Sequence, residues 1–288
     1  MIKIKVPATS ANLGPGFDSL AIALNIYNEF RVEKSKKLDF GNVPKEFANK
    51  KNLFYIAYKK TCKFLKKDSN FTLNIVDNIP ISRGLGSSAS LIVAGALAAN
   101  KLNGNKLSKD EIFQICCEIE GHPDNVSAAL YGGLCVCISD NKKYICGKFN
   151  IGRKLNFTVI IPDYRLSTTA SRKVLPKKYD KADSVFNISR SIYMVEGLKN
   201  ENMDLIKLGA HDKIHQPYRK KLIKNFDKLK NICEKHGAAF VLSGAGPTCI
   251  AISNKKNLAQ QICKDIIKIK PNCNYLIMDC KIDNKGAK

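Results

Sequence analysis

The 288-residue sequence contains no tryptophan, only four histidines, and 25 acidic side chains against 48 basic ones. It lacks any Cys-x-x-Cys pair, so its eleven cysteines indicate neither a zinc site nor a thioredoxin-type centre. It also lacks a charged-then-apolar leader and any apolar run long enough to cross a membrane. These absences predict a cytoplasmic protein with reduced, buried thiols and no membrane partner.

The net charge of +23 makes nucleic acid or another anionic partner plausible. However, the lysines are spread along the chain in ones and twos, and no segment interleaves clustered Lys and Arg with aromatic residues. The charge therefore indicates solvated, lysine-rich faces, and no nucleic-acid partner is expected. A hydrophobic fraction of 44% is enough for one large or two ordinary domains.

The most informative stretch is Pro80-Ile-Ser-Arg-Gly-Leu-Gly-Ser-Ser-Ala-Ser90. It lies between a predicted strand over residues 71–76 and a predicted buried helix over residues 89–99. Its two glycines let backbone N–H groups approach a ligand, and a helix start adds unpaired donors and partial positive charge. The stretch therefore predicts a phosphate cradle, with the charge of Arg83 beside it. The plain alternative is a helix capped by a serine after a tight turn.

This stretch fits neither of the two commoner phosphate loops. Gly86 is followed by Ser87 where a Walker loop needs lysine, and Ala89 stands where the dinucleotide fingerprint needs a third glycine. The stretch instead resembles the second motif of the GHMP kinases, Pro-x-x-x-Gly-Leu-Gly-Ser-Ser-Ala, which wraps the phosphates of ATP.

The remaining pattern predicts strands and helices in two α+β layers that share a cleft. Ser108 followed by Glu111 predicts a capping box at a helix start. Further helices are expected over residues 53–65, 167–173, 184–198, 203–210, 220–236 and 257–269, and strands over 1–6, 19–34, 134–138, 155–161, 238–242, 249–252 and 275–278. Loops are expected over residues 7–18, 140–153 and 215–219, with the domain boundary near residue 153.

Four further stretches agree with the phosphate motif. Residues 7–18 resemble the first GHMP motif in the form found in homoserine kinases, and Ser243-Gly-Ala-Gly-Pro-Thr248 resembles the third. Residues 120–125 and 283–287 are similar to segments of bacterial homoserine kinases. Because these stretches span almost the whole chain in family order, the sequence resembles the homoserine kinases of the GHMP family.

The resemblance implies an α+β fold of two domains. The N-terminal, ATP-binding domain over residues 1–153 would resemble domain 2 of ribosomal protein S5, and the C-terminal domain over 154–288 would be ferredoxin-like. The implied activity is MgATP-dependent phosphorylation of the side-chain hydroxyl of L-homoserine to O-phospho-L-homoserine, in threonine biosynthesis. A homodimer is possible.

Site residues follow from the same resemblance. Ser88 and Glu120 match positions that hold magnesium, which prefers hard oxygen ligands. Asn125 stands where many GHMP kinases carry an aspartate base, and an amide cannot take a proton, so catalysis without a strong side-chain base is implied. The implied catalytic set is Ser88, Glu120, Arg83 and Asn125. The implied ATP-binding set is Pro80, Ile81, Ser82, Arg83, Gly84, Leu85, Gly86, Ser87, Ser88, Ala89 and Ser90.

Homoserine carries a carboxylate and an ammonium group, so its site needs cations and acceptors. Arginine can hold a carboxylate with two parallel hydrogen bonds. The resemblance implies Arg172 and Arg219 for the carboxylate, Asn12, Asp18 and His122 near the amino and hydroxyl ends, and Gly244 and Gly246 for close approach of the third loop.

Two other functions stay open at this point. One is another GHMP kinase acting on mevalonate, a phosphorylated intermediate or shikimate, against which Asn125 and the loop over residues 7–18 favour homoserine. The other is an RNA-binding protein on an S5-like domain, which the charge suggests and the phosphate loops disfavour.

Overall fold

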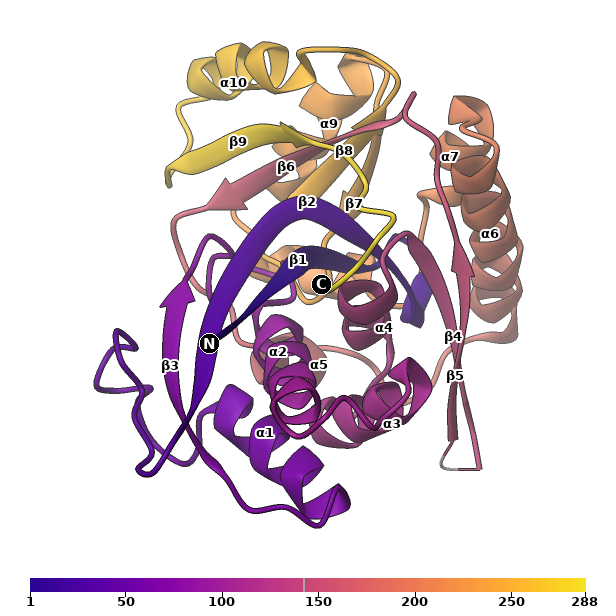
Figure 1. Cartoon of the computed structure of the whole chain (residues 1–288). Coiled ribbons are helices and arrows are strands. Elements are labelled where there is room, and N and C mark those ends of the chain that lie inside the picture. The colour runs from indigo at the N-terminus through magenta and orange to yellow at the C-terminus, as the bar shows by residue number, and fades with distance from the viewer. Residues whose placement is uncertain (142) are drawn as a thin grey trace.

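The computed structural model describes residues 1–141 and 143–288, which form two antiparallel sheets flanked by helices (Figure 1). The first sheet is built around β2 (Gly16–Ser35), which pairs with strands on both sides. Its partners are β1 (Ile2–Asn12), β3 (Asn70–Val76) and β4 (Leu134–Asp140), and β4 pairs in turn with β5 (Lys143–Phe149).

Four helices pack together beside this first sheet: α1 (Leu53–Phe64), α2 (Ser87–Leu102), α3 (Lys109–Glu120) and α4 (Asp124–Tyr131) (Figure 1). Helix α2 lies among the others, and its residues 92–100 are all buried, as its small and aliphatic sequence predicts. The predicted capping box of α3 is confirmed, because Ser108 and Glu111 exchange both hydrogen bonds.

The second sheet has the order β7-β8-β6-β9. Its strands are β6 (Asn156–Pro162), β7 (Ala239–Leu242), β8 (Cys249–Ser253) and β9 (Tyr275–Cys280). The accompanying helices are α5 (Thr168–Lys173), α6 (Lys181–Lys199), α7 (Met203–Gly209), α8 (Gln216–Arg219), the 3-10 turn η1 (Lys220–Leu222), α9 (Phe226–Lys235) and α10 (Leu258–Lys268).

One hydrophobic cluster joins the two layers. Leu20 and Ile22 of β2 belong to the same buried cluster as Phe157 and Val159 of β6 and Met194 of α6. The two sheets therefore meet across packed side chains, and the cleft at their junction has walls that cannot separate without exposing apolar surface.

Three loop predictions were wrong. Residues 140–153 contain β5, in which Tyr144 and Cys146 pack against buried clusters while Lys143 and Ile145, on the other face of the strand, are exposed. Residues 7–18 are largely strand, with β1 and β2 joined by a short turn. Residues 216–219 form α8, and the expected helix over 220–236 is interrupted after η1, where Asn225 adopts a left-handed conformation at φ 60°.

The chain ends on the first sheet although β9 belongs to the second. The backbone of Lys288 exchanges hydrogen bonds with that of Lys5, and the N–H of Ala287 donates to the carbonyl of Ala129. Residues 281–288, which the predicted division assigns to the second domain, thus close over the first layer. The boundary near residue 153 stays a prediction.

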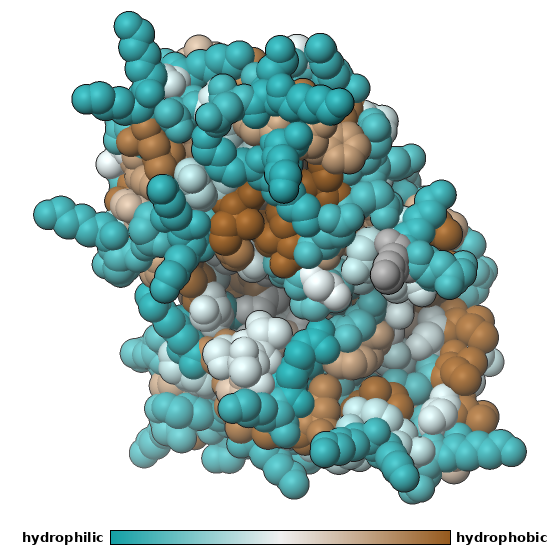
Figure 2. Space-filling view, turned by 90° about the horizontal axis from the view of Figure 1, so that it is seen from below, coloured by the Kyte–Doolittle hydropathy of each residue, from teal (hydrophilic) through white to brown (hydrophobic). Residues whose placement is uncertain are grey.

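Charge and thiols are distributed much as the composition suggests. Figure 2 shows hydrophilic side chains over most of the lower face, with hydrophobic patches between them. All eleven cysteines are free; most are buried, but Cys263 is exposed, which the expectation of buried thiols did not include. Among the described residues, no helix combines the length and apolar character that a membrane crossing requires.

Candidate active site

A cleft of about 700 Å³ lies between the two layers. Its walls bring together stretches that are far apart in the sequence, namely residues within 11–18, 81–91, 120–125, 166–172 and 244–246. All three predicted motif loops therefore meet at one cavity, and the question becomes what each side chain does there.

The predicted phosphate cradle lies at the start of α2. Gly86 precedes the helix at φ 68°, and among the described residues no side chain caps it. The first helical bond runs from the N–H of Ser90 to the carbonyl of Gly86, so the N–H groups of residues 87–89 lie outside the helical ladder. The alternative of a serine-capped helix is wrong, and the free donors with the helix dipole make this end suited to an anion.

Two glycines bring the three motif loops into direct contact. A Cβ at Gly86 would lie 1.9 Å from Oγ1 of Thr9, and a Cβ at Gly84 would lie 2.4 Å from the carbonyl oxygen of Ser243. Both residues also have positive φ, which favours glycine. The requirement for glycine here is therefore steric as well as conformational.

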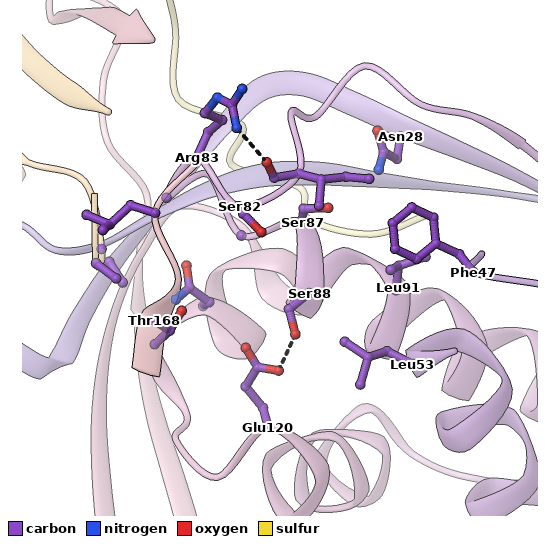
Figure 3. A pocket seen from close by; sticks show the side chains of 18 of the residues that line it. Asn28, Phe47, Leu53, Ser82, Arg83, Ser87, Ser88, Leu91, Glu120 and Thr168 are labelled. Atoms are coloured by element: carbon purple, nitrogen blue, oxygen red, sulfur yellow. Dashed lines mark hydrogen bonds between the residues drawn. The ribbon is translucent and has the colours of Figure 1, made fainter. Parts of the chain in front are cut away.

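Ser88 and Glu120 meet at the edge of this cradle (Figure 3). Oγ of Ser88 donates to Oε2 of Glu120 at 2.7 Å. Burial raises the pKa of Glu120, while the Ser88 hydroxyl and the charge of His122 oppose that rise. A desolvated carboxylate beside a hydroxyl and a helix start offers two hard oxygen donors next to an anion site, which fits a magnesium ion shared with phosphate oxygens.

Asn125 has a fixed orientation. Oγ1 of Thr9 donates to its Oδ1 at 2.7 Å, so its Nδ2 is the group left to act as a donor. Asn125 lines the cleft. Its amide can hydrogen-bond a hydroxyl or a phosphoryl oxygen but cannot accept a proton.

The neighbouring Asp124 also lines the cleft, but it is more deeply buried than Asn125. It is almost fully buried, and its Oδ1 accepts from the N–H of Asn125 at 2.7 Å. The same oxygen lies 3.0 Å from Nδ1 of His122. Burial disfavours the imidazolium of His122, but Asp124 and Glu120 outweigh burial and raise its pKa. His122 is thereby favoured as a donor rather than as a proton acceptor.

One end of the cleft, here called the charged end, carries an ion pair. Nη1 and Nη2 of Arg172 donate to the two carboxylate oxygens of Asp18 at 3.0 and 2.8 Å. Both side chains keep about a third of their surface exposed, at 38% and 35%. The sequence assigned these residues to opposite ends of one substrate, whereas in this structure they bind each other.

Arg219 lies beside this pair and is 2% exposed. Its Nη1 donates to the carbonyl of Gly244 at 3.0 Å, and its Nε donates to that of Ser171 at 3.2 Å. Burial and the charge of Arg172 lower the pKa of Arg219 to about 10. Nη2 has no acceptor among the described residues and remains available to a ligand carboxylate.

Two predicted ligands serve the framework in this structure. Asn12 donates through Nδ2 to the carbonyl of Gly244, and its Oδ1 accepts from the N–H of Asp18, so its amide joins the first and third motif loops. Arg83 lines the cleft, but its guanidinium donates to the carbonyls of Ile81, Pro162 and Asp163. The expected free charge beside the cradle is thus replaced by a contact between the two layers, because unpaired carbonyls stand within reach of Arg83.

The apolar end of the cleft was missed. Phe47, Leu53 and Leu91 line it beyond the cradle, with Asn28 nearby (Figure 3). Leu53 and Leu91 sit on helices whose pattern indicated only core packing, and Phe47 lies in a turn-rich segment without a motif. The only available signal was that phosphate cradles need a neighbouring pocket for the rest of the nucleotide.

Comparison with known proteins agrees with these motifs. Residues 52–133 match the family described as GHMP kinases N terminal domain, and residues 194–270 match GHMP kinases C terminal. A homoserine kinase from Clostridium botulinum, strain Alaska E43, is 45% identical over 295 residues, which cover 100% of this chain and 98% of that protein.

Solved structures agree as well. The crystal structure of homoserine kinase from Cytophaga hutchinsonii superposes with a TM-score of 0.89 at 28% identity, covering 100% of this chain and 96% of that one. The mevalonate kinase of Methanococcus jannaschii superposes with a TM-score of 0.72 at 20% identity, covering 98% of each chain, which shows a shared fold alone.

Proposed function

Because the chain belongs to the homoserine kinases of the GHMP kinase family, we propose that its cleft binds MgATP and L-homoserine side by side. The chain is an ATP-dependent phosphotransferase, and its reaction moves the γ-phosphoryl group to the side-chain hydroxyl. The product, O-phospho-L-homoserine, belongs to threonine biosynthesis. A cytoplasmic location and a homodimer remain predictions.

The cleft has an apolar end and a polar end, and this difference supports one orientation for bound ATP. Phe47, Leu53 and Leu91 offer an apolar pocket for the base, and the start of α2 offers free N–H groups for the phosphates. In this proposed orientation the γ-phosphate lies toward Ser88 and Asn125, next to the charged end of the cleft. Phosphoryl transfer depends mainly on such positioning and on neutralising the phosphate oxygens.

Ser88 and Glu120 are the residues proposed to hold magnesium. A bound Mg²⁺ would neutralise charge on the phosphates. The chain itself contributes a hydroxyl and a carboxylate that are already 2.7 Å apart. Their proximity to the cradle supports this assignment.

The observation that carries homoserine as substrate is the grouping of Asp18, Arg172 and Arg219. The two arginines match a carboxylate, and Asp18 matches an ammonium group. An α-amino acid that separates Asp18 from Arg172 gives each of them a new partner of opposite charge. A hydroxy acid such as mevalonate has no ammonium group, so a carboxylate that drew Arg172 away from Asp18 would leave Asp18 without a partner, and an unpaired charged group is costly in a binding site.

The proposed mechanism has no side-chain base. Asn125 cannot accept a proton, Oδ1 of Asp124 is occupied by His122 and by the N–H of Asn125, and His122 has a raised pKa. Asn125 therefore orients the substrate hydroxyl by donating to its oxygen through Nδ2. As the new O–P bond forms, the bond between Pγ and the β,γ-bridging oxygen breaks, ADP leaves, and the hydroxyl proton passes to an oxygen of the transferred phosphoryl group. Placement of the hydroxyl in line with the γ-phosphate supplies the catalysis.

A coupled ADP-release assay tests the substrate directly. The substrates compared are homoserine, mevalonate, shikimate, threonine and 4-hydroxybutyrate, which is homoserine without its ammonium group. We expect turnover with homoserine and at least about a hundredfold lower kcat/KM with 4-hydroxybutyrate. Equal turnover of the two would contradict the role of Asp18, and salt-dependent RNA binding without any ATP turnover would favour the RNA-binding alternative.

A further inference from the structure

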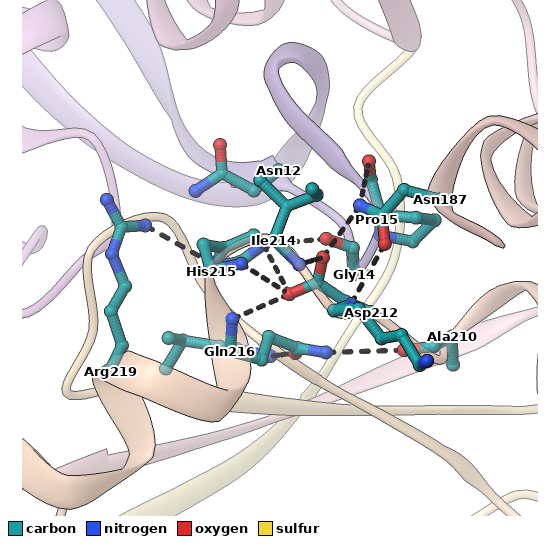
Figure 4. Close-up of polar contacts among 12 residues, drawn as sticks. Asn12, Gly14, Pro15, Asn187, Ala210, Asp212, Ile214, His215, Gln216 and Arg219 are labelled. Atoms are coloured by element: carbon teal, nitrogen blue, oxygen red, sulfur yellow. Dashed lines mark hydrogen bonds and ion pairs between the residues drawn. The ribbon is translucent and has the colours of Figure 1, made fainter. Parts of the chain in front are cut away.

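A buried polar network lies behind the charged end of the cleft and does not line it (Figure 4). We call it the Asp212 network; it consists of Asp212, Asn187, His215 and Gln216. The side chains of Asp212 and His215 are both fully buried. A buried carboxylate is costly unless every oxygen is hydrogen-bonded, so a network of this kind needs a reason.

Asp212 anchors the start of α8. Its Oδ2 accepts from the N–H groups of His215 at 3.0 Å and Gln216 at 2.6 Å, and its Oδ1 accepts from the N–H of Ile214 at 2.9 Å. Helix α8 is only four residues long and has few intrahelical hydrogen bonds. The bonds to Asp212 therefore contribute more to fixing the direction of the helix than its own hydrogen bonds do. Arg219 is the last residue of this helix, and its position follows from that of α8.

His215 connects α8 to both sides of the proposed amino-acid pocket. Its Nε2 lies 2.6 Å from the carbonyl oxygen of Gly14, in the turn that joins β1 to β2. A carbonyl only accepts, so Nε2 carries the proton and Nδ1 keeps its lone pair. That lone pair faces Arg219, whose Nη1 donates to it at 3.4 Å.

The surroundings favour this neutral tautomer. Burial lowers the pKa of His215; the charge of Arg219 adds to this lowering, and Asp212 opposes it. A protonated ring would turn Nδ1 into a second donor facing a guanidinium. Neutral His215 can therefore accept from Arg219 while it donates to Gly14.

The network also holds the turn that precedes Asp18. Asn187 donates through Nδ2 both to Oδ1 of Asp212 at 2.8 Å and to the carbonyl of Pro15 at 3.1 Å. The ring of Phe17 stacks on His215 with centroids 5.4 Å apart, and the Arg219 guanidinium lies 5.1 Å from the same ring. One buried cluster therefore sets the positions of both the arginine and the aspartate of the pocket.

We propose that Asp212 and His215 are positioning residues that hold Arg219 with Nη2 directed at the substrate carboxylate. This rests on the proposed function of Arg219 as a carboxylate ligand. Neither residue touches substrate; each acts through α8 and through the Nδ1 acceptor. Without that acceptor, Nη1 loses one of its two partners and the guanidinium can rotate away from the cleft.

The test is a series of three substitutions at His215. Asparagine places an amide oxygen near the position of Nδ1 and retains the acceptor for Arg219. Glutamine places its amide nitrogen near the position of Nε2 and retains the donor to Gly14 but not that acceptor. Alanine retains neither.

We expect the KM for homoserine to rise in the order His215→Asn, His215→Gln, His215→Ala, with the last two raised roughly five- to thirtyfold and the KM for ATP nearly unchanged. His236→Asn is the matched control, because His236 pairs with Asp265 at 2.9 Å away from the cleft. The control is expected to leave both KM values unchanged.

If His215 has only a structural role, the homoserine KM of each variant should correlate with its unfolding temperature. If the proposal is right, the KM should depend on whether the variant retains an acceptor for Arg219. A KM that is equal in His215→Asn and His215→Gln, or that rises together for ATP and homoserine, would overturn the proposal. Asp212→Asn, which keeps the shape of the side chain, is expected to raise the homoserine KM in the same selective way.

A second readout separates this proposal from the substrate assignment. In protein labelled with isotope-enriched arginine, the Nε–H signal of Arg219, assigned with Arg219→Lys, should shift in His215→Gln and His215→Ala but not in His236→Asn. This shift needs no substrate. If wild-type protein does not phosphorylate homoserine but the signal shifts, the proposed function fails and the positioning stands; an unmoved signal overturns the positioning.

Discussion

At the scale of single residues, the site depends on a few oxygens and cations whose partners the structure identifies. Ser88, Glu120 and Asn125 line the cleft, and each has a hydrogen bond that fixes its orientation; their catalytic roles stay predictions. The motifs predicted separate substrate contacts for Asp18 and Arg172, whereas the structure shows the two side chains paired with each other. A zwitterionic substrate would have to separate this pair.

Replacing Ser88 by alanine should lower kcat by about a hundredfold or more, comparable to losing one preorganised charge-stabilising group. The reason is that Glu120 would lose its hydroxyl partner and the proposed magnesium site one of its two protein oxygens. Steady-state rates across a magnesium titration measure this. Ser87→Ala is the control, since it keeps the backbone donors of the same helix turn, and equal rates for the two variants would contradict the assignment.

Asp18→Asn should raise the KM for homoserine by roughly ten- to a hundredfold and leave the KM for ATP nearly unchanged, because one charged hydrogen-bonded contact contributes about 1.5–3 kcal/mol. The same selective rise is expected for Arg219→Ala, with only partial recovery in Arg219→Lys, which retains charge but not the planar fork. If both KM values rise together, these residues do not form the amino-acid pocket.

At the scale of secondary-structure elements, the catalytic arrangement depends on where strands and helices stop. Helix α2 begins at an uncapped glycine, α3 ends at Glu120, and α4 begins beside Asn125. Three helix ends therefore converge on the predicted phosphate cradle. The glycines of the second motif allow the convergence, because the first and third motif loops approach their backbone directly.

Gly86→Ala should weaken ATP binding and destabilise the fold. A left-handed conformation costs a non-glycine residue about 1–2 kcal/mol, and the added Cβ would also meet Oγ1 of Thr9 at 1.9 Å. Denaturant unfolding and the KM for ATP measure the two effects. Adding Thr9→Ala should recover part of the stability by removing the clash; no recovery would mean that backbone strain alone is responsible.

At the scale of the whole molecule, both apolar and polar contacts join the layers. A shared hydrophobic cluster connects the sheets, and residues 281–288 return from β9 to the first layer. The buried Asp212 network adds a polar connection between α8 and the β1–β2 turn. These contacts fix the two layers, and therefore the two walls of the cleft, relative to each other.

Removing residues 281–288 should lower the unfolding temperature of the whole protein. The deletion removes the hydrogen bonds of Lys288 to Lys5 and of Ala287 to Ala129, and it leaves their backbone groups without these partners. Thermal unfolding followed by circular dichroism provides the measurement. An unchanged midpoint would show that the tail is peripheral to the stability of the first layer.

Stability should also depend on pH through His215. Because the folded protein lowers the pKa of this residue, the unfolded chain binds more protons between that lowered value and about 6.5. The free energy of unfolding should therefore fall as the pH drops below about 6.5. Denaturant titrations of wild type and His215→Asn on both sides of that pH compare the slopes, and the variant should show the weaker dependence.

The sequence alone was sufficient for the family and the two-layer α+β fold, and it located the glycine loop before α2, whose role as a phosphate cradle stays a prediction. Glycine spacing, small residues in α2 and the Ser108–Glu111 capping box are local signals, since each depends on neighbours within a few positions along the chain. These features agree with the structure because residues close in sequence restrict the backbone to few conformations.

Tertiary structure decided the features whose partners lie far apart in sequence. The commitment of Arg83 to carbonyls of the second layer, the Asp18–Arg172 pair and the position of residues 281–288 are of this kind. Strand β5 is also of this kind. Its sequence contains lysines and no clear apolar alternation, so it is identified as a strand only by its pairing with β4. Hydrogen bonds and ion pairs depend on distance in space, and only the folded chain brings these groups within reach of one another.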